Sequence, residues 1–216
     1  IDLARKMAAD LDVKIEFIDN DWDGLIPGLQ SNKFDIVLAQ MSISAKRQLA
    51  VDFTKPWEVI GLSAIVKADS DCVTIECLNS PDKTISTILG STSQPAKARL
   101  FPNAKETANK GRNDAFLEVL SGRSDAFITD NVSASSYMSE HPGTVKNPFD
   151  GIGQAYLETE PAAPAVAKGN GNSDFAIWID FWLAEQINNG TYQTIYLNNI
   201  GVAAAVDELM LQRGQY

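Results

Sequence analysis

The sequence predicts an α/β fold of two lobes joined by two strands, and three observations support this. A segment at 29–40 is nearly repeated at 120–130: in each copy a helix-like stretch ends at a small polar turn, a basic residue follows, and an Asp opens a short apolar strand. Helix and strand patterns alternate along the chain, as α/β folds require. Two extended crossings, near 61–68 and 160–169, divide the chain. One lobe therefore interrupts the other, and such hinged lobes close around ligands.

The first lobe is expected to open on an amphipathic helix at 1–11 that has no lead-in. We therefore expect an upstream strand, with any signal peptide, to be absent from this chain. The following expected elements are a strand at 13–18, a helix at 22–30 capped by Asp21, a strand at 35–39, a short helix from the N-cap Ser44 to about 49, and strands at 51–53 and 61–67.

A polar stretch at 69–83 marks the change to the second lobe. Its expected elements are a strand at 85–89, a turn at 90–93, a helix with Pro95 in its first turn, and helices at 113–120 and 132–139. A Gly/Pro/Asn-rich passage to 153, a return strand at 163–167 and helices at 175–188 and 202–212 follow. These elements predict a first lobe of 1–64 and 165–216 and a second lobe of 65–164.

The composition is that of an ordinary globular protein, with 44% apolar and 21% charged residues. There are 18 basic and 28 acidic residues, for a net charge of −10. This balance disfavours nucleic acid and anionic membrane as partners, because both require a basic surface. No apolar run approaches the roughly 20 residues that span a bilayer.

The cysteines Cys72 and Cys77 are separated by four residues. They are candidates for a local disulfide in an oxidising compartment, or else two free thiols. Together with the distant His141 they do not form a tetrahedral ligand set, so we expect no metal and no cofactor.

The segment Gln40-Met41-Ser42 leaves a strand and leads into a short helix that carries Arg47 in its first turn. Free N–H groups at a helix start attract anions, whereas a cation there is disfavoured. An anion between Arg47 and these groups resolves the conflict, and a carboxylate fits the guanidinium fork. The alternative is a surface ion pair between Arg47 and Asp52.

Two further polar sites are expected in the second lobe. The turn that contains Thr92 precedes a helix and can hold an anion, or it can be a simple helix cap. Asp130 ends an apolar strand, where open α/β sheets place ligand groups, or it is the N-cap of the next helix. With a positive charge at Arg47 and a negative one at Asp130, a zwitterion is the expected ligand. Trp57 is either a flat ligand wall or part of the core.

A set of ordered motifs then resembles a known family. The runs are Trp22-Asp23-Gly24-Leu25-Ile26-Pro27-Gly28-Leu29, Phe34-Asp35-Ile36-Val37, Met41-Ser42-Ile43-Ser44 with Arg47, Val51-Asp52-Phe53-Thr54-Lys55-Pro56, Gly90-Ser91-Thr92 and Thr129-Asp130. They resemble the amino-acid-binding proteins of bacterial ABC importers, which have the two-lobed type II periplasmic-binding-protein fold. The resemblance implies that Arg47 grips the ligand α-carboxylate with help from Ser42 and Thr92, that Asp130 takes the α-ammonium, and that Gln40 lies beside it.

The sequence departs from the family pattern at three places. Gln40 stands where a small residue is frequent, Trp57 replaces a common Tyr, and Ala162-Ala163 follows Pro161 where an aromatic residue and a Gly are usual.

The resemblance implies a monomeric periplasmic or extracytoplasmic protein that captures an amino acid and delivers it to an ABC transporter permease. Cyclohexadienyl (arogenate or prephenate) dehydratases resemble the same fold, so an enzyme is the alternative. Its acid would be Glu158 or Glu160, since a leaving hydroxyl needs a proton donor. The ligand-sensing domain of a membrane receptor is a third interpretation.

Overall fold

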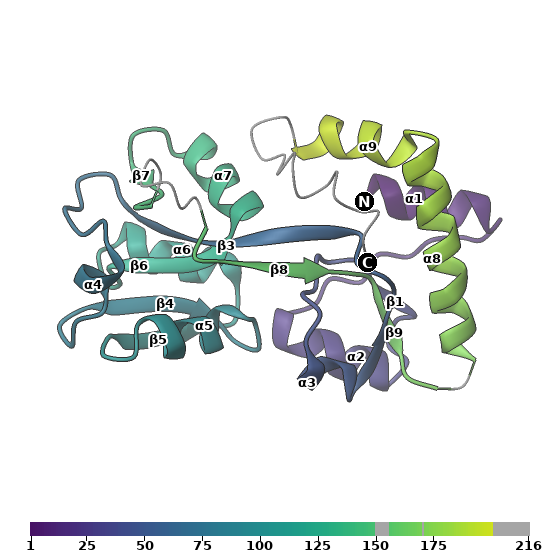
Figure 1. Ribbon diagram of the computed structural model, residues 1–216, viewed down its shortest axis with the longest axis horizontal. Helices are drawn as coiled ribbons and strands as arrows, with labels where there is room; N and C mark the ends of the chain where they lie inside the picture. Colours follow the sequence, from purple (N-terminus) through teal and green to yellow (C-terminus); the bar gives the residue numbers. More distant parts are fainter. Residues whose placement is uncertain (150–155, 170, 201–216) are drawn as a thin grey trace. The chain divides into compact units, whose positions relative to one another are not determined.

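The computed structural model describes residues 1–149, 156–169 and 171–200 (Figure 1). These residues form two compact units. Unit 1 contains residues 1–20, 24–59 and the described residues from Pro161 onward, and unit 2 contains residues 21–23 and the described part of 60–160. Apart from the short segment 21–23, the chain passes between the units at 59/60 and 160/161, a few residues before the predicted boundaries at 64/65 and 164/165. The helix expected at 202–212 and the end of the passage expected up to 153 lie outside the described residues.

Unit 1 is built on a three-stranded sheet with the order β1-β9-β2. Strands β1 (Ile36–Val37) and β2 (Val51–Phe53) both pair antiparallel with β9 (Ala165–Ala167). The helices of this unit are α1 (Asp2–Asp10), α2 (Leu25–Gln30), α3 (Ala45–Gln48), α8 (Asn172–Asn188) and α9 (Thr191–Ile200), and a 3₁₀ turn η1 (Trp22–Gly24) leads into α2.

Unit 2 contains a sheet with the order β5-β4-β6-β3-β7. Its strands are β4 (Thr84–Ile88), β5 (Lys105–Asn109), β6 (Ala126–Asp130), β7 (Val145–Lys146) and the long β3 (Glu58–Lys67), with which β8 (Glu158–Ala162) pairs. Its helices are α4 (Ile75–Leu78), α5 (Ser93–Leu100), α6 (Arg112–Leu120) and α7 (Asn131–Glu140). Strands β5 and β6 run parallel to β4, whereas β3 is antiparallel to β6. The predicted α/β class is therefore confirmed.

The predicted strand at 13–18 is wrong, because this segment forms neither a strand nor a helix. Val13 and Phe17 are 57% and 52% exposed. The side chains alternate as in a strand, but a strand also needs a neighbour for its backbone N–H and C=O groups, and side-chain alternation cannot supply one.

The sequence pattern did not predict strand β5, which is a strand without apolar alternation. Its residues, Lys-Glu-Thr-Ala-Asn, lack apolar alternation because β5 is an edge strand, where exposed polar side chains are common.

The repeated segments share one local structure. In the first copy, the N–H groups of Ser31 and Asn32 bond the carbonyls of the last turn of α2, and Asn32 has a φ of 56°. In the second copy, Ser121 and Gly122 make the same bonds at the end of α6, and Gly122 has a φ of 75°. Both turns need a left-handed residue, which Gly and Asn adopt most easily. The sequence repeat therefore encodes the same helix stop twice.

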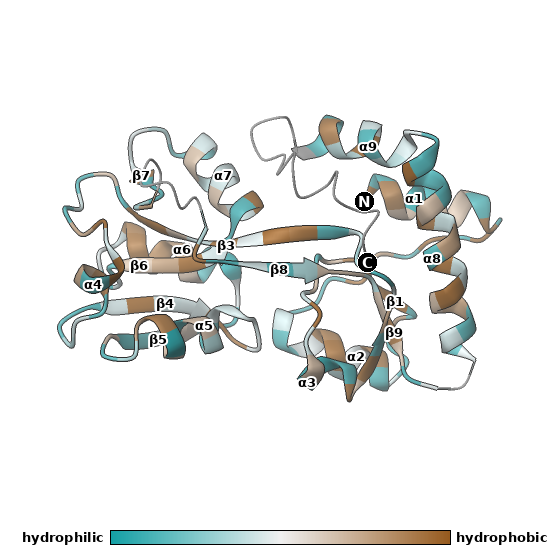
Figure 2. Ribbon diagram, viewed as in Figure 1, coloured by the Kyte–Doolittle hydropathy of each residue, from teal (hydrophilic) through white to brown (hydrophobic). Residues whose placement is uncertain are grey.

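The sheet of unit 2 has a hydrophobic cluster on each face. Ala126 and Ile128 pack on one face with Phe101 and Leu78, whereas Phe127, between them in sequence, packs on the other face with α6 and α7. Figure 2 shows the resulting apolar stretch of β3 and β6. Alternate side chains point to opposite faces, so both faces are covered and the strands read as continuous apolar runs.

The core of unit 1 is rich in aromatic residues. Trp57, Trp182 and Tyr192 are buried in it, and α8 supplies much of the cluster together with α1. The indole of Trp182 donates to Asp10 Oδ2 at 2.8 Å, which ties α8 to the end of α1. Here an aromatic side chain combines apolar burial with a satisfied polar group.

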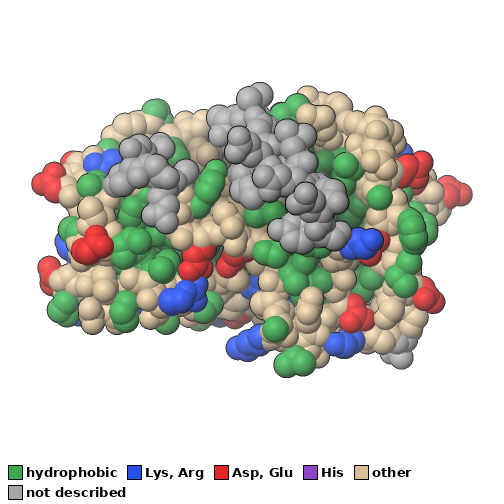
Figure 3. Space-filling view, viewed as in Figure 1, with side chains coloured by type: hydrophobic (Ala, Val, Ile, Leu, Met, Phe, Trp, Pro, Cys, Tyr) green, Lys and Arg blue, Asp and Glu red, His purple; other side chains and the backbone are tan. Residues whose placement is uncertain are grey.

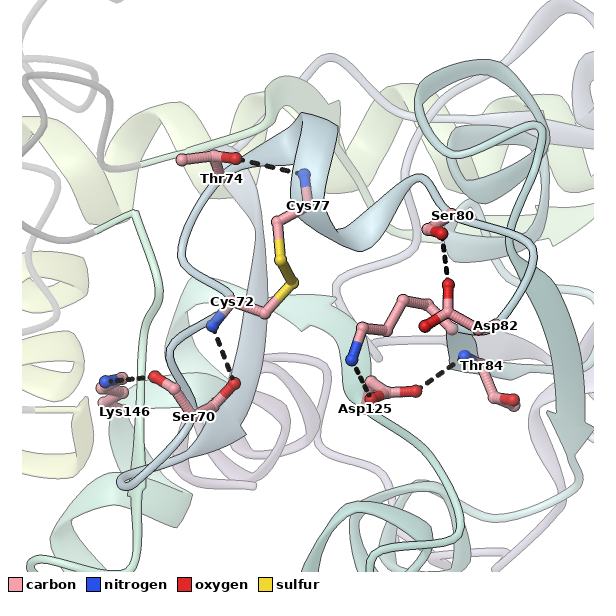
Figure 4. The surroundings of a disulfide bond; sticks show 10 residues. Ser70, Cys72, Thr74, Cys77, Ser80, Asp82, Thr84, Asp125 and Lys146 are labelled. Atoms are coloured by element: carbon pink, nitrogen blue, oxygen red, sulfur yellow. Dashed lines mark hydrogen bonds and ion pairs between the residues drawn. A yellow bond between two sulfur atoms is a disulfide. The ribbon is translucent and has the colours of Figure 1, made fainter.

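Cys72 and Cys77 form a disulfide in the structure (Figure 4). The bond lies in the polar connection between β3 and β4. Thr74 caps α4 by accepting from the Cys77 N–H at 3.1 Å, and Ser70 accepts from the Cys72 N–H at 3.2 Å. Lys146 donates to the Ser70 carbonyl at 2.8 Å, so β7 also holds this connection.

Acidic and basic side chains are both spread over the face drawn in Figure 3. No helix in the described ranges combines the length and apolar content needed to cross a bilayer.

Candidate functional site

Gln40, Met41 and Ser42 follow β1 in unit 1 and run alongside the end of β8. Gln40 has a φ of 54°, a left-handed conformation unusual for a residue other than Gly. Met41 is fully buried, and its carbonyl accepts from the Ala163 N–H at 3.1 Å. Ser42 is buried and forms an antiparallel bridge with Ala162. The return strand therefore fixes the backbone of the predicted carboxylate site.

Arg47 lies in the first turn of α3, as predicted. Ser44 is the N-cap, and its hydroxyl accepts from the Arg47 N–H at 3.2 Å. The Arg47 side chain is only 8% exposed, and its Nη1 donates to the Ser42 carbonyl at 2.8 Å. The guanidinium thus turns back onto the segment that leads into its own helix. Asp52, the alternative partner, accepts from Ser173 Oγ at 3.1 Å and lies 3.9 Å from Lys168 Nζ.

Sequence reasoning missed Glu58 as a polar residue of this region. Its carboxylate accepts from Gln40 Nε2 at 3.0 Å, and the residue is only 4% exposed. The sequence signal that could have identified Glu58 is its position as an acidic residue directly after Trp57, at the start of an apolar strand. A buried carboxylate is costly without partners, so its place beside Gln40 marks this end of β3 as polar.

Trp57 is 8% exposed and packs in the core, with its ring centroid 6.1 Å from that of Tyr192. Of the two interpretations, the structure places this side chain in the core cluster of unit 1. Its Nε1 has no hydrogen-bond partner among the described residues.

The predicted residues of unit 2 lie at one edge of its sheet. Strands β4 and β6 are parallel neighbours, and the carboxyl ends of parallel strands meet at the same edge. Thr92 follows β4, Asp130 ends β6, and Arg112 follows β5. The sequence predicted the first two of these and missed Arg112.

The turn before α5 is closed by its own serines. Ser93 Oγ accepts from the Ile88 N–H at 3.1 Å, and Ser91 Oγ donates to the Ile88 carbonyl at 2.9 Å. Thr92 holds the N-cap position, but its side chain makes no capping bond. Instead its hydroxyl donates to Glu160 Oε2, on β8, at 2.8 Å. The Thr92 hydroxyl therefore does not cap α5, although the serines of the same turn accept backbone N–H groups.

Asp130 is the N-cap of α7. Its Oδ1 accepts from the Ser133 N–H at 2.8 Å, and its Oδ2 accepts from the Ser133 hydroxyl at 2.8 Å. Arg112 Nη2 lies 3.4 Å from the same Oδ2. The Asp130 side chain is 12% exposed. Both carboxylate oxygens are thus engaged, although a carboxylate offers about four acceptor positions, so an ammonium can still be added.

Arg112 is the first residue of α6, where the helix dipole disfavours a cation. The Asp130 carboxylate opposite compensates for this. The Nε atom of Arg112 is buried and has no hydrogen-bond partner among the described residues. Nearby, the Tyr137 hydroxyl donates to Asn113 Oδ1 at 2.7 Å, and burial raises the pKa of the Tyr137 phenol, an effect that the Arg112 charge opposes.

Within residues 1–149, 156–169 and 171–200, no three His, Cys, Asp or Glu side chains lie close enough to hold a metal ion. The described side chains can bind a ligand through charge and hydrogen bonds. In unit 1 the group is Arg47, and in unit 2 the groups are the Asp130 carboxylate and the hydroxyl of Thr92.

Comparison with known proteins places this arrangement in a family. A probable histidine-binding protein from Campylobacter jejuni is 32% identical over 145 residues, which are 67% of this chain and 56% of that protein. The glutamine-binding protein GlnH of a Bacillus subtilis ABC transporter is 30% identical over 199 residues, 91% of this chain and 70% of that protein. The chain thus spans only a little over half the length of the first relative.

The crystal structure of an ancestral amino acid-binding protein, a precursor of cyclohexadienyl dehydratase, superimposes with a TM-score of 0.81. It is 35% identical and covers 92% of this chain and 83% of its own. The family model of the bacterial extracellular solute-binding proteins, family 3, matches residues 1–202. The chain belongs to this family.

Proposed function

We propose that the protein is an extracytoplasmic binding protein that captures a free amino acid and delivers it to an ABC transporter. The observation that carries this proposal is the pair of opposite charges at two helix starts: Arg47 in the first turn of α3 and Asp130 as the N-cap of α7. In the proposal both act on one ligand, Arg47 on its α-carboxylate and Asp130 on its α-ammonium. The names of the histidine-binding and glutamine-binding relatives support a free amino acid as the ligand class.

The chemistry of Arg47 suits a carboxylate. A guanidinium presents a planar fork of donors, and Nη1 uses one of them to bind the Ser42 carbonyl. That bond, together with burial, removes much of the side chain's freedom before ligand arrives, so little further ordering is needed on binding. Ser42 and the Thr92 turn contribute further donors in this proposal, and Gln40 lies beside the ammonium end.

Charge-assisted hydrogen bonds contribute about 1.5–3 kcal/mol each. Four or five of them, less the costs of association and closure, correspond to roughly −8 kcal/mol, which is about micromolar affinity.

The test begins with a thermal-shift screen of the twenty amino acids, followed by calorimetry on those that stabilise the protein. Asp130→Asn keeps an oxygen to cap α7 but removes the charge, so we expect about 10- to 100-fold weaker binding with nearly unchanged thermal stability. Arg47→Ala is expected to abolish binding. Because Arg47 is buried, its melting curve must show that the fold survives.

Lys46→Ala is the matched control, since Lys46 is an exposed cation one residue from Arg47 on the same helix. We expect its affinity to equal that of the wild type. Equal affinity in Asp130→Asn and the wild type would reject the assigned role of Asp130.

One observation favours a second candidate, a dehydratase acting on prephenate or arogenate. The carboxylate of Glu160 lies at the Thr92 turn, among the residues proposed to bind the ligand, whereas Glu158 is paired with Arg99. The ancestral neighbour is a precursor of such an enzyme, although that protein itself is amino acid-binding. Formation of phenylpyruvate or phenylalanine by the purified protein would favour the enzyme, and binding without turnover would favour the carrier.

A further inference from the structure

The hydroxyl of Thr92 donates to the Glu160 carboxylate at 2.8 Å. The proposed function gives the same hydroxyl to the ligand α-carboxylate. A threonine hydroxyl has a single proton to donate, so it cannot serve two carboxylates at once. The two carboxylates also carry like charges, which disfavour each other at close range.

We propose that Glu160 is an affinity-determining residue of the amino-acid site, because its carboxylate occupies the Thr92 hydroxyl and competes with the ligand carboxylate for it. This inference rests on the proposed function. In this inference the Glu160 carboxylate takes the place at the Thr92 hydroxyl that the proposed function gives to the ligand α-carboxylate.

The pairing of β8 with β3 holds the backbone of Glu160 beside the Thr92 turn. The Leu157 N–H donates to the Leu62 carbonyl at 2.7 Å, so β8 is anchored on β3 just before Glu160. Alternate residues of a strand share a face, which puts Glu158 and Glu160 on the same side of β8. Glu158 binds Arg99, in the last turn of α5, and Glu160 binds Thr92, at its start. Two carboxylates of one strand thus hold the two ends of one helix.

The position at the start of α5 suits an anion. The helix dipole and its unpaired N–H groups favour a negative charge there, whether it comes from a ligand or from the chain. The sequence predicted an anion-holding turn at 90–93, and the structure places one of the protein's own carboxylates against it. A ligand carboxylate must therefore displace Glu160 or bind without this hydroxyl.

The experiment compares wild type, Glu160→Gln, Glu158→Gln and Thr92→Val by calorimetry. The probes are L-glutamine and L-histidine, each with its α-carboxamide, which lacks the acid group. Glutamine at position 160 keeps the size of the side chain and removes its charge. A neutral hydrogen bond is weaker than a charged one. We therefore expect Glu160→Gln to bind the acids about tenfold more tightly and the amides with less than a twofold change.

Glu158→Gln is the matched control, since it removes an equal charge from the same strand but not from the turn. Its affinity for the acids should stay within about twofold of the wild type, because an exposed ion pair contributes little. In the Thr92→Val background, which lacks the contested hydroxyl, adding Glu160→Gln should change affinity by less than about twofold.

The outcomes separate the two proposals. If Glu160→Gln binds the acids and the wild type does not, the inference holds in its strongest form, in which Glu160 blocks the site. Equal affinity of wild type and Glu160→Gln overturns the inference and leaves the proposed function standing. An equal gain for acids and amides also overturns it, because the effect then does not involve the ligand carboxylate. If no variant binds any of the twenty amino acids, the proposed function fails and the inference fails with it.

Discussion

Tyr137 shows how one residue links packing to titration in unit 2. Its ring stacks on Phe116 with centroids 4.0 Å apart, and its hydroxyl donates to Asn113. Burial raises the phenol pKa above its ordinary value of 10.0. The neutral form is thus favoured in the folded state, so this contribution to stability is fully present below about pH 10 and is lost as the pH rises through the raised pKa.

Tyr137→Phe should keep the ring stack and lose the hydrogen bond. We expect it to be less stable than the wild type by about 1 kcal/mol at pH 8. Above pH 10 this difference should shrink, because only the wild type then has to ionise a buried phenol. Urea unfolding at several pH values between 8 and 11.5 measures it. A difference that stays constant over this range would contradict the assignment.

The sequence predicted correctly those residues whose structural position depends only on their near neighbours in the chain. Ser44 as an N-cap and Arg47 in the first turn follow from a few neighbouring residues, and the structure has both. Arg112 could not be found this way, and neither could the contact of Glu160, a candidate acid in the sequence, with Thr92. Thr92 and Glu160 are 68 residues apart, and no local signal joins them. Asp130 was expected either to cap α7 or to bind ligand; it caps α7, and its ligand role stays a proposal.

At the scale of elements, the two repeats differ in what their shared Asp does. Asp125, before β6, accepts from Lys83 Nζ at 3.0 Å and from the Thr84 N–H at 2.9 Å, which ties the start of β4 to β6 (Figure 4). This contact raises the pKa of the Lys83 ammonium. Asp35, the equivalent residue in unit 1, is exposed. The sequence showed the repeated helix stop, but not which copy uses its Asp to hold a neighbouring strand.

The disulfide connection is expected to stabilise unit 2 without affecting the ligand. Cys72 follows the end of β3 at Lys67, which pairs with Val145, whereas Asp130 pairs with Leu62 in the middle of the strand. In the chain-entropy model, closing so short a loop contributes about 2 kcal/mol. A Cys72→Ser/Cys77→Ser variant should therefore unfold about 4–8 °C lower.

Amino-acid affinity in the same variant should equal that of the wild type. Calorimetry and a melting curve on one preparation check both statements. Reduced wild type provides an independent comparison without any substitution. A loss of affinity at unchanged melting temperature would show that the connection influences the ligand residues, against the expectation from the sheet.

At the scale of the whole molecule, the predicted organisation required contacts between distant parts of the chain. Unit 1 is completed by β9, which lies more than 100 residues after β1 and β2 in sequence, yet pairs with both. The sequence indicated this return as a strand at 163–167, within the second crossing. It could not indicate that 13–18 pairs with no strand among the described residues, because alternation reports only which side of a segment is apolar.

Ligand binding should stabilise the folded protein by an amount set by mass action. If the proposed function is right, an amino acid at 100 times its dissociation constant adds about 2.7 kcal/mol to the free energy of unfolding. For a chain of this size that corresponds to a rise of about 5–10 °C in melting temperature. The rise should grow with the logarithm of ligand concentration and fall to about half or less in Asp130→Asn at the same concentration, because the ligand is then at only about 1 to 10 times that variant's dissociation constant. Because that variant keeps the cap of α7, its loss of ligand stabilisation would reflect the missing charge rather than a damaged fold. A rise of equal size in both proteins would mean that the ligand binds elsewhere.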